Sequence, residues 1–148
     1  MKIPCITLSV KYSEDVKQSE LSSLKSSLDA SEIARNCFNK DTFFIQEQFI
    51  VLMLNQANKI IGYYPLSTGG LTSTVVDVRL IFSIAIKTFA TAIIIAHNHP
   101  SGQLKASQAD KQITKRIKDA GEILDIKLLD HIIITDESYF SFADEGEL

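Results

Sequence analysis

Two histidines, His97 and His99, follow directly after a five-residue apolar run in this chain. The run, residues 92–96, predicts a short strand in the middle of a sheet. Residues two apart on a strand face the same side, so both imidazoles are expected to project together while Asn98 points away. Strand ends are also where ligands usually bind in open α/β sheets. The pattern therefore constrains the chain to a buried sheet with a pair of imidazoles at one end of its strands.

A sharp turn and a helical pattern follow the histidines. Pro100 and Gly102 are typical of a turn, and Ser107 begins a helix predicted over residues 107–124. Asp110 lies in the first turn of that helix, on the side of its inner apolar residues, so we expect it to face the histidines. Two imidazoles and one carboxylate are the ligand set of a hydrolytic zinc site, in which a fourth position holds a water that the metal acidifies.

The residues that open this helix also fit a second interpretation. Ser107 and Asp110 stand three apart, as do the N-cap and the third residue of a helical capping box. A His-x-His pair alone is likewise a weak indication of a metal site. The conjunction of the three groups on a strand, a turn and a helix favours the metal site. Ser107 can cap the helix and still direct its hydroxyl toward that site.

The composition indicates a globular protein of modest size. The 148 residues carry a formal net charge of −3, so attraction of the whole surface to a phosphate backbone is not expected. The longest nearly unbroken apolar run, residues 89–96, is too short to cross a bilayer, and the first residues lack the pattern of a signal peptide. One pair of cysteines, Cys5 and Cys37, does not make a disulfide framework. We therefore expect a cytoplasmic protein with no membrane partner.

The first forty residues are expected to form a separate N-terminal part. Residues 1–40 are predicted to hold a peripheral strand at 3–10, a mobile connector, and a helix at 27–38. Asp29 or Ser31 is expected to cap that helix.

Residues 41–148 are expected to form the main domain, in which strands and helices alternate. The other expected elements are a hairpin at 49–54 and 59–66, a helix from its cap Asp77 to about residue 89, a strand at 126–134, and a tail at 139–142 that packs back onto the body. Such alternation favours an α/β sandwich around a mixed sheet.

The histidine motif resembles a known family. His97-x-His99, seven residues, Ser107, two residues and Asp110 resemble the JAMM signature of the JAB/MPN metallopeptidases at every defined position. The sequence His-Asn-His-Pro-Ser-Gly at 97–102 and Leu-Asp-His-Ile-Ile at 129–133 resemble the RadC-like branch. The resemblance runs from about Asp41 to the C-terminus. Longer RadC-like proteins carry an N-terminal helical domain that residues 1–40 do not resemble, so we expect the stand-alone form.

The resemblance implies a fold, a metal and a set of roles. The fold is the cytidine-deaminase-like α-β-α sandwich with a mixed sheet, and the cofactor is one zinc ion (Zn²⁺) held by His97, His99 and Asp110. In the family, a glutamate before the first core strand acts as general base, and Glu47 stands just before the predicted strand at 49–54. The motif serine, here Ser107, stabilises the oxyanion.

A second glutamate of many RadC-like sequences has no counterpart here. It precedes the Gly-rich segment, where this chain has Tyr-Pro-Leu-Ser at residues 64–67. If that glutamate were the essential base, Pro65 would leave this protein inactive. Glu47 is therefore the residue that we expect to carry the proton, since a general base must reach the water.

The predicted function is hydrolysis of an amide, peptide or isopeptide bond by a zinc-activated water. The expected substrate is a peptide or a protein conjugate. The alternatives are a DNA-repair-associated RadC-like module and a non-catalytic MPN scaffold; the charge gives nucleic acid no support. A zinc deaminase is disfavoured because the chain has no Pro-Cys-x-x-Cys pair. The oligomeric state stays open, with a homodimer among the candidates.

Two further features have a plain structural interpretation. His131, in a predicted strand, is interpreted as a structural histidine paired locally, with orientation of a metal ligand as the alternative. The cations along and before the helix at 107–124 are interpreted as its solvated face, with a polyanion-binding surface as the alternative. These cations are Lys105, Lys111, Lys115, Arg116 and Lys118.

Overall fold

The computed structural model describes residues 2–69 and 75–148. Its helical elements are the 3-10 helix η1 (Gln18–Glu20) and the α-helices α1 (Ser27–Cys37), α2 (Val78–Lys87) and α3 (Gln108–Ile123). Its strands are β1 (Gln48–Leu54), β2 (Ile60–Thr68), β3 (Ala92–Asn98), β4 (Lys127–Ile134) and β5 (Tyr139–Ser141). The strands form one sheet in the order β2-β1-β3-β4-β5, in which only the β3–β4 pair is parallel.

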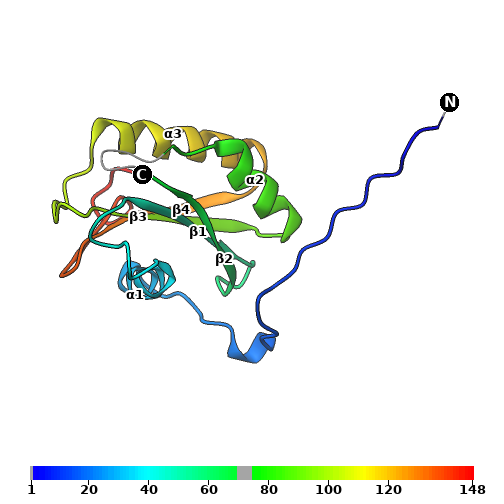
Figure 1. Cartoon of the computed structure of the whole chain (residues 1–148), viewed down its shortest axis with the longest axis horizontal. Helices are drawn as coiled ribbons and strands as arrows, with labels where there is room; N and C mark the ends of the chain where they lie inside the picture. The colour runs from blue at the N-terminus through cyan, green and yellow to red at the C-terminus, as the bar shows by residue number, and fades with distance from the viewer. Residues whose placement is uncertain (1, 70–74) are drawn as a thin grey trace.

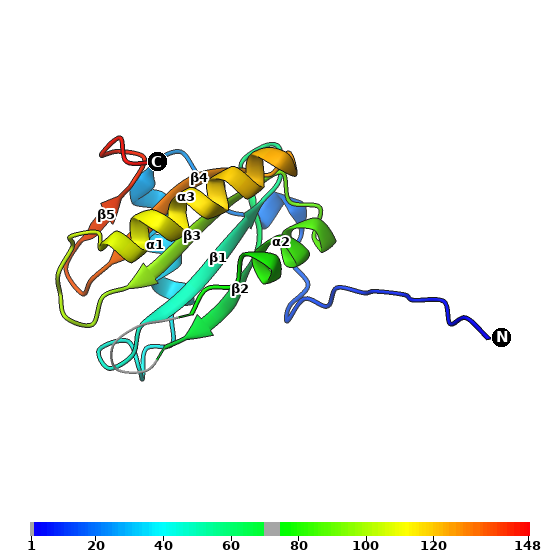
Figure 2. The same cartoon turned by 90° about the horizontal axis from the view of Figure 1, so that it is seen from above.

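The sheet is the middle layer of three. Helices α2 and α3 cover one face and α1 covers the other (Figure 1). Figure 2 looks onto the first face, where α3 lies lengthwise across the sheet and α2 lies beside it. The predicted α-β-α sandwich with a mixed sheet is confirmed. No helix within the described ranges is both long and apolar enough to cross a membrane.

The alternation of side chains along β3 decides where the histidines point. Ile93 and Ile95 belong to the core beneath α2 and α3. Ile94 and Ala96 belong to the core that packs against α1. Continuing this alternation, His97 falls on the α3 face and the next residue falls on the α1 face. Phe49 of β1 also faces α3. By the same alternation, Glu47, two residues earlier, is placed on the α3 face.

An irregularity in β4 changes the facing of its second half. The strand contains one extra residue, Leu129, between the pairing positions of Leu128 and Asp130. Such a bulge shifts the alternation by one. As a result, Leu128 and His131 both face α3, and Ile132 faces α1.

Most predicted elements are found at or near their expected positions. The hairpin, the Asp77 cap of α2, the Ser107 cap of α3 and the return of the C-terminal tail are confirmed. Helix α2 ends at Lys87, two residues before the expected end, because Phe89 adopts a left-handed backbone with a φ of 55°. Phe142 in the tail is fully buried.

The predicted N-terminal strand is wrong. Residues 3–10 have no strand structure, and Figure 1 shows the segment extending away from the body. Ile3, Ile6 and Leu8 are exposed. An extended segment becomes a stable strand only when a neighbour supplies its backbone hydrogen bonds, and none of the described residues does so here.

The predicted cap of α1 is also wrong. The helix begins at Ser27, and the hydroxyl of Ser26 accepts from the Asp29 backbone N–H at 3.2 Å. Asp29 instead accepts from the Lys25 backbone N–H at 2.9 Å. Ser31 lies a turn further on, where its hydroxyl donates to the Leu28 carbonyl. The N-cap is Ser26, three residues before Asp29, so the helix starts earlier than either predicted cap allows.

Candidate metal centre

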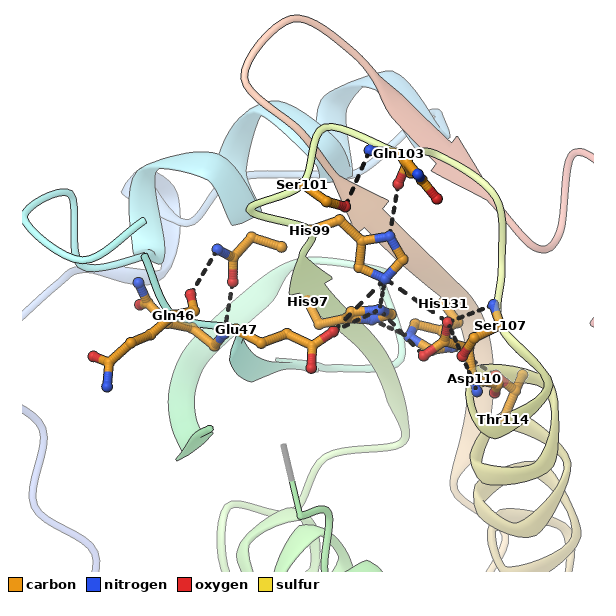
Figure 3. A network of polar contacts seen from close by, with 12 residues as sticks. Gln46, Glu47, His97, His99, Ser101, Gln103, Ser107, Asp110, Thr114 and His131 are labelled. Atoms are coloured by element: carbon orange, nitrogen blue, oxygen red, sulfur yellow. Dashed lines mark hydrogen bonds and ion pairs between the residues drawn. The ribbon is translucent and has the colours of Figure 1, made fainter. Parts of the chain in front are cut away.

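Four polar side chains converge where β3 ends (Figure 3). The Nε2 atoms of His97 and His99 are 2.9 Å apart. From the first turn of α3, Asp110 places Oδ1 3.3 Å from His97 Nε2 and Oδ2 3.8 Å from His99 Nε2. From the segment before β1, Glu47 places Oε1 3.9 Å and 3.7 Å from the same two nitrogens. The structure thus brings together the four groups predicted as ligands and base.

A chain of hydrogen bonds fixes the tautomer of His97. The Thr114 hydroxyl donates its only proton to the Asp110 carbonyl at 2.6 Å, so its oxygen accepts from His131 Nδ1, also at 2.6 Å. His131 is fully buried, which lowers the pKa of its imidazole well below the usual value and keeps the ring neutral. Its Nε2 therefore accepts from His97 Nδ1 at 2.8 Å. This leaves the Nε2 lone pair of His97 directed into the site.

The tautomer of His99 is fixed in the same sense. Its Nδ1 lies 2.6 Å from the Gln103 carbonyl, which can only accept a hydrogen bond. The lone pair of His99 therefore also lies on Nε2. Two lone pairs 2.9 Å apart repel unless a proton or a metal cation lies between them. The arrangement suits a metal ion, because neutral imidazoles held by a bond from the opposite nitrogen are typical metal ligands.

Asp110 forms the predicted capping box and also faces the histidines. Its Oδ2 accepts from the backbone N–H and the hydroxyl of Ser107 at 2.7 Å and 2.6 Å, while its backbone N–H donates to that hydroxyl. The capping box is present, and Oδ1 still faces His97. Burial alone would raise the pKa of the Asp110 carboxyl, but the His97 ring, when it is protonated, and the hydrogen bonds from Ser107 outweigh it and hold that pKa well below the usual value. The carboxylate is thus charged and held in place.

The separations fit a tetrahedral ion. Ligand atoms about 2.0–2.1 Å from a tetrahedral zinc lie roughly 3.4 Å from one another. The two Nε2 atoms are 2.9 Å apart, and Asp110 approaches His97 with Oδ1 at 3.3 Å and His99 with Oδ2 at 3.8 Å. Glu47 also forms a compact group with the histidines, with ligand atoms within 4.8 Å of one another. Two ligand sets are therefore sterically available, one with Asp110 as the third ligand and one with Glu47. The assignment of Asp110 as ligand and Glu47 as base stays a prediction.

A pocket of about 210 Å³ opens beside these side chains. Its lining is mixed, so a substrate could present a reacting group to the polar residues and a hydrophobic group to the apolar ones. The polar residues include Glu47, His97 and Asp110, and the apolar residues include Phe49, Val76 and Ile113.

The structure corrects the interpretation of His131 as a histidine paired only locally. Its ring lies between Thr114 and His97 and holds the latter in one tautomer. Thr114 itself was not among the predicted site residues, although it lies one helical turn after Asp110 and therefore on the same face. Pro65 lies in β2, where it pairs with Ile50 of β1. Strand β1 therefore separates Pro65 from β3, which leads to the histidines.

Asn98 determines where Glu47 lies. The Asn98 side chain is fully buried on the α1 face. Its Oδ1 accepts from the Gln48 backbone N–H at 2.6 Å, and its Nδ2 donates to the carbonyls of Phe43 and Gln46 at 2.7 Å and 3.0 Å. These bonds tie the segment that carries Glu47 to the strand that carries the histidines. In the sequence, the only indication of this role is that Asn98 stands between His97 and His99 and is therefore expected to face the opposite side of the sheet.

Replacing Asn98 with alanine is expected to lower the free energy of unfolding by about 2–4 kcal/mol, because two buried backbone groups and one partly buried carbonyl lose their partner. Urea unfolding followed by circular dichroism measures this loss. Asn36→Ala is the matched control, since its exposed side chain bonds only to the Glu32 carbonyl. Equal stability of the two variants would contradict the role given to Asn98.

Comparison with known proteins gives a consistent picture. The profile of a family described as the RadC-like JAB domain matches residues 24–147. A UPF0758 protein of Flavobacterium johnsoniae is 60% identical over 100 residues, which cover 68% of this chain and 44% of the relative. A UPF0758 protein of Porphyromonas gingivalis is 52% identical over 104 residues, covering 70% and 46%. One from Geotalea uraniireducens is 34% identical over 145 residues, covering 98% and 64%. The chain spans less than half the length of the first two relatives and 64% of the third.

Proposed function

The chain belongs to the RadC-like JAB domain family, and we propose that it is a zinc-dependent hydrolase that cleaves an amide, peptide or isopeptide bond. The observation that carries the proposal is the pair of Nε2 lone pairs, on His97 and His99, 2.9 Å apart with the Asp110 carboxylate 3.3 Å away. Neutral imidazoles and a charged carboxylate are the donor set of hydrolytic zinc sites.

The surrounding side chains support this chemistry. His97, His99 and Asp110 would hold the ion. Bound there, zinc would supply a Lewis acid for the scissile carbonyl and would lower the pKa of a water. Glu47 lies within 3.9 Å of both Nε2 atoms, so its carboxylate would take up the proton of that water and pass it to the leaving amine. The Ser107 hydroxyl would donate to the developing oxyanion after turning away from Asp110 Oδ2.

The substrate proposed is a peptide or a protein conjugate, and the proposed location is the cytoplasm. Cys5 and Cys37 are both free thiols, which a reducing compartment maintains. Burial raises the pKa of the Cys37 thiol to about 11, so this cysteine is suited to packing and poorly suited to acting as a nucleophile.

The DNA-associated alternative has less support from the surface. Lys111 pairs with Glu147 and Lys115 pairs with Asp119, each at 2.8 Å. These pairs neutralise two of the five cations of the stripe that a polyanion would need. A DNA-binding titration at several salt concentrations tests the nucleic-acid module, where a negligible salt dependence would exclude it. The non-catalytic scaffold is an outcome of the test below.

The test measures metal content and hydrolysis together. Untagged protein purified without chelators is expected to contain about one zinc per chain by elemental mass spectrometry. A panel of fluorogenic peptide and isopeptide substrates is then offered to the protein as purified, after chelation and after zinc is restored. Cleavage that is lost on chelation and recovered with zinc is the expected result. Protein that binds no zinc even when it is offered would favour the scaffold.

A further inference from the structure

One cation of α3 differs from its neighbours. Lys111 and Lys115 form ion pairs, and the ammonium of Lys118 donates to the Leu148 carbonyl at 3.3 Å. Within residues 2–69 and 75–148, the guanidinium of Arg116 has no ion pair or hydrogen bond. Arg116 instead lines the pocket beside the candidate metal centre. Arg116 is exposed, as a solvated face predicts, but a solvated face does not by itself account for its place in the lining of this pocket.

The position of Arg116 along α3 sets the layout of the pocket. Asp110, Ile113 and Arg116 follow one another at intervals of three and share the face that lines the pocket. At about 1.5 Å per residue, Arg116 is roughly 9 Å along the helix axis from Asp110. Ile113 lies between them, with Phe49 and Val76 in the same pocket. A substrate would thus meet the metal-binding groups, then an apolar section, then a cation.

We propose that Arg116 binds the free C-terminal carboxylate of a peptide substrate. The apolar section of the pocket, formed by Phe49, Val76 and Ile113, would bind the substrate side chain next to that carboxylate. The proposal rests on the hydrolase function proposed above. An extended peptide advances about 3.3–3.6 Å per residue, so the distance along α3 corresponds to two or three residues between the scissile bond and the chain end. The planar guanidinium matches a carboxylate with two parallel hydrogen bonds.

The pocket favours a peptide terminus over a nucleic acid. A nucleic acid carries a phosphate on every nucleotide, and these would meet the carboxylates of Glu47 and Asp110, which line the same pocket. A peptide terminus carries a single charge, which can reach Arg116 while the apolar part of the chain occupies the section between. The order of polar, apolar and cationic groups therefore fits one terminal anion.

The test compares two probes that differ only at the chain end. Acetyl-Ala-Ala-Leu-Ala is prepared as the free acid and as the C-terminal amide, and each dissociation constant is measured by calorimetry on zinc-free and on zinc-loaded protein. The free acid is expected to bind about tenfold or more tightly than the amide. Arg116→Ala should remove that preference and Arg116→Lys should restore part of it. Lys115→Ala, which removes the neighbouring charge outside the pocket, should leave it intact.

The outcomes separate this proposal from the hydrolase itself. Equal binding of acid and amide by the unmodified protein would overturn the role of Arg116, whatever the zinc content. A preference that survives in Arg116→Ala would do the same. If a single-stranded oligonucleotide displaces the free acid and its binding needs Arg116, the site is one for phosphate. If the protein binds no zinc but retains the Arg116-dependent preference, the hydrolase fails and the carboxylate site stands.

Discussion

Asp110→Asn is expected to bring the zinc content close to zero under conditions in which the unmodified protein retains about one ion per chain. Asparagine keeps an oxygen for the Ser107 backbone N–H, so the helix cap survives. What is lost is the negative charge that faces His97 across 3.3 Å. Because an amide is a far weaker zinc ligand than a carboxylate, we expect at least a hundredfold loss of affinity. Competition with a chromogenic chelator measures it.

Two companion variants decide which carboxylate is the third ligand. Ser107→Ala leaves both carboxylates and removes only the hydroxyl that orients Asp110, so a loss of about 10–100-fold in affinity is expected. Glu47→Gln should bind zinc as tightly as the unmodified protein. If Asp110→Asn retains full zinc and Glu47→Gln loses it, the ligand set is the compact group of Glu47, His97 and His99.

The arrangement of the histidine motif could be predicted from the sequence because it depends on the local alternation of side chains along a strand. Strand parity places His97 on the α3 face, and the turn with Gly102, whose φ is 77°, lets the next helix begin beside it. The capping box of Ser107 and Asp110 follows from a three-residue spacing. Each of these features is decided within about fifteen residues of chain, so pattern and turn chemistry were enough.

The contacts that hold Glu47 and His97 in place could not be predicted from the sequence, because they join segments that are distant along the chain. Asn98 reaches across to Phe43, 55 residues earlier, and no local pattern indicates that a buried amide has such partners. His131 faces His97 only because Leu129 bulges out of the β3–β4 pairing. A regular strand would have turned His131 toward α1. The predicted N-terminal strand failed for the same reason, since alternation alone does not supply a partner.

Glu47→Gln is expected to lower kcat about 10²–10⁴-fold while leaving the zinc content and KM nearly unchanged. The amide has the same size as the carboxylate, but it cannot take up a proton near neutral pH. The measurement is steady-state hydrolysis of whichever reporter the zinc-loaded protein cleaves, with elemental analysis of each preparation. Glu137→Gln, the same change at an exposed position in the turn between β4 and β5, is the matched control.

The position of Glu47 makes this result specific. Asn98 holds the preceding backbone, and the Glu47 carbonyl accepts from the Gly69 N–H at 2.7 Å, so the substitution should not move the segment. A reduced kcat with full zinc content therefore reports the loss of the Glu47 carboxylate from the reaction and not the loss of the metal or a shift of the backbone. Full activity in Glu47→Gln would show that the base lies elsewhere. Since Pro65 occupies the other family position and stands opposite Ile50, beyond β1 from the histidines, a base from outside this set of residues would then be required.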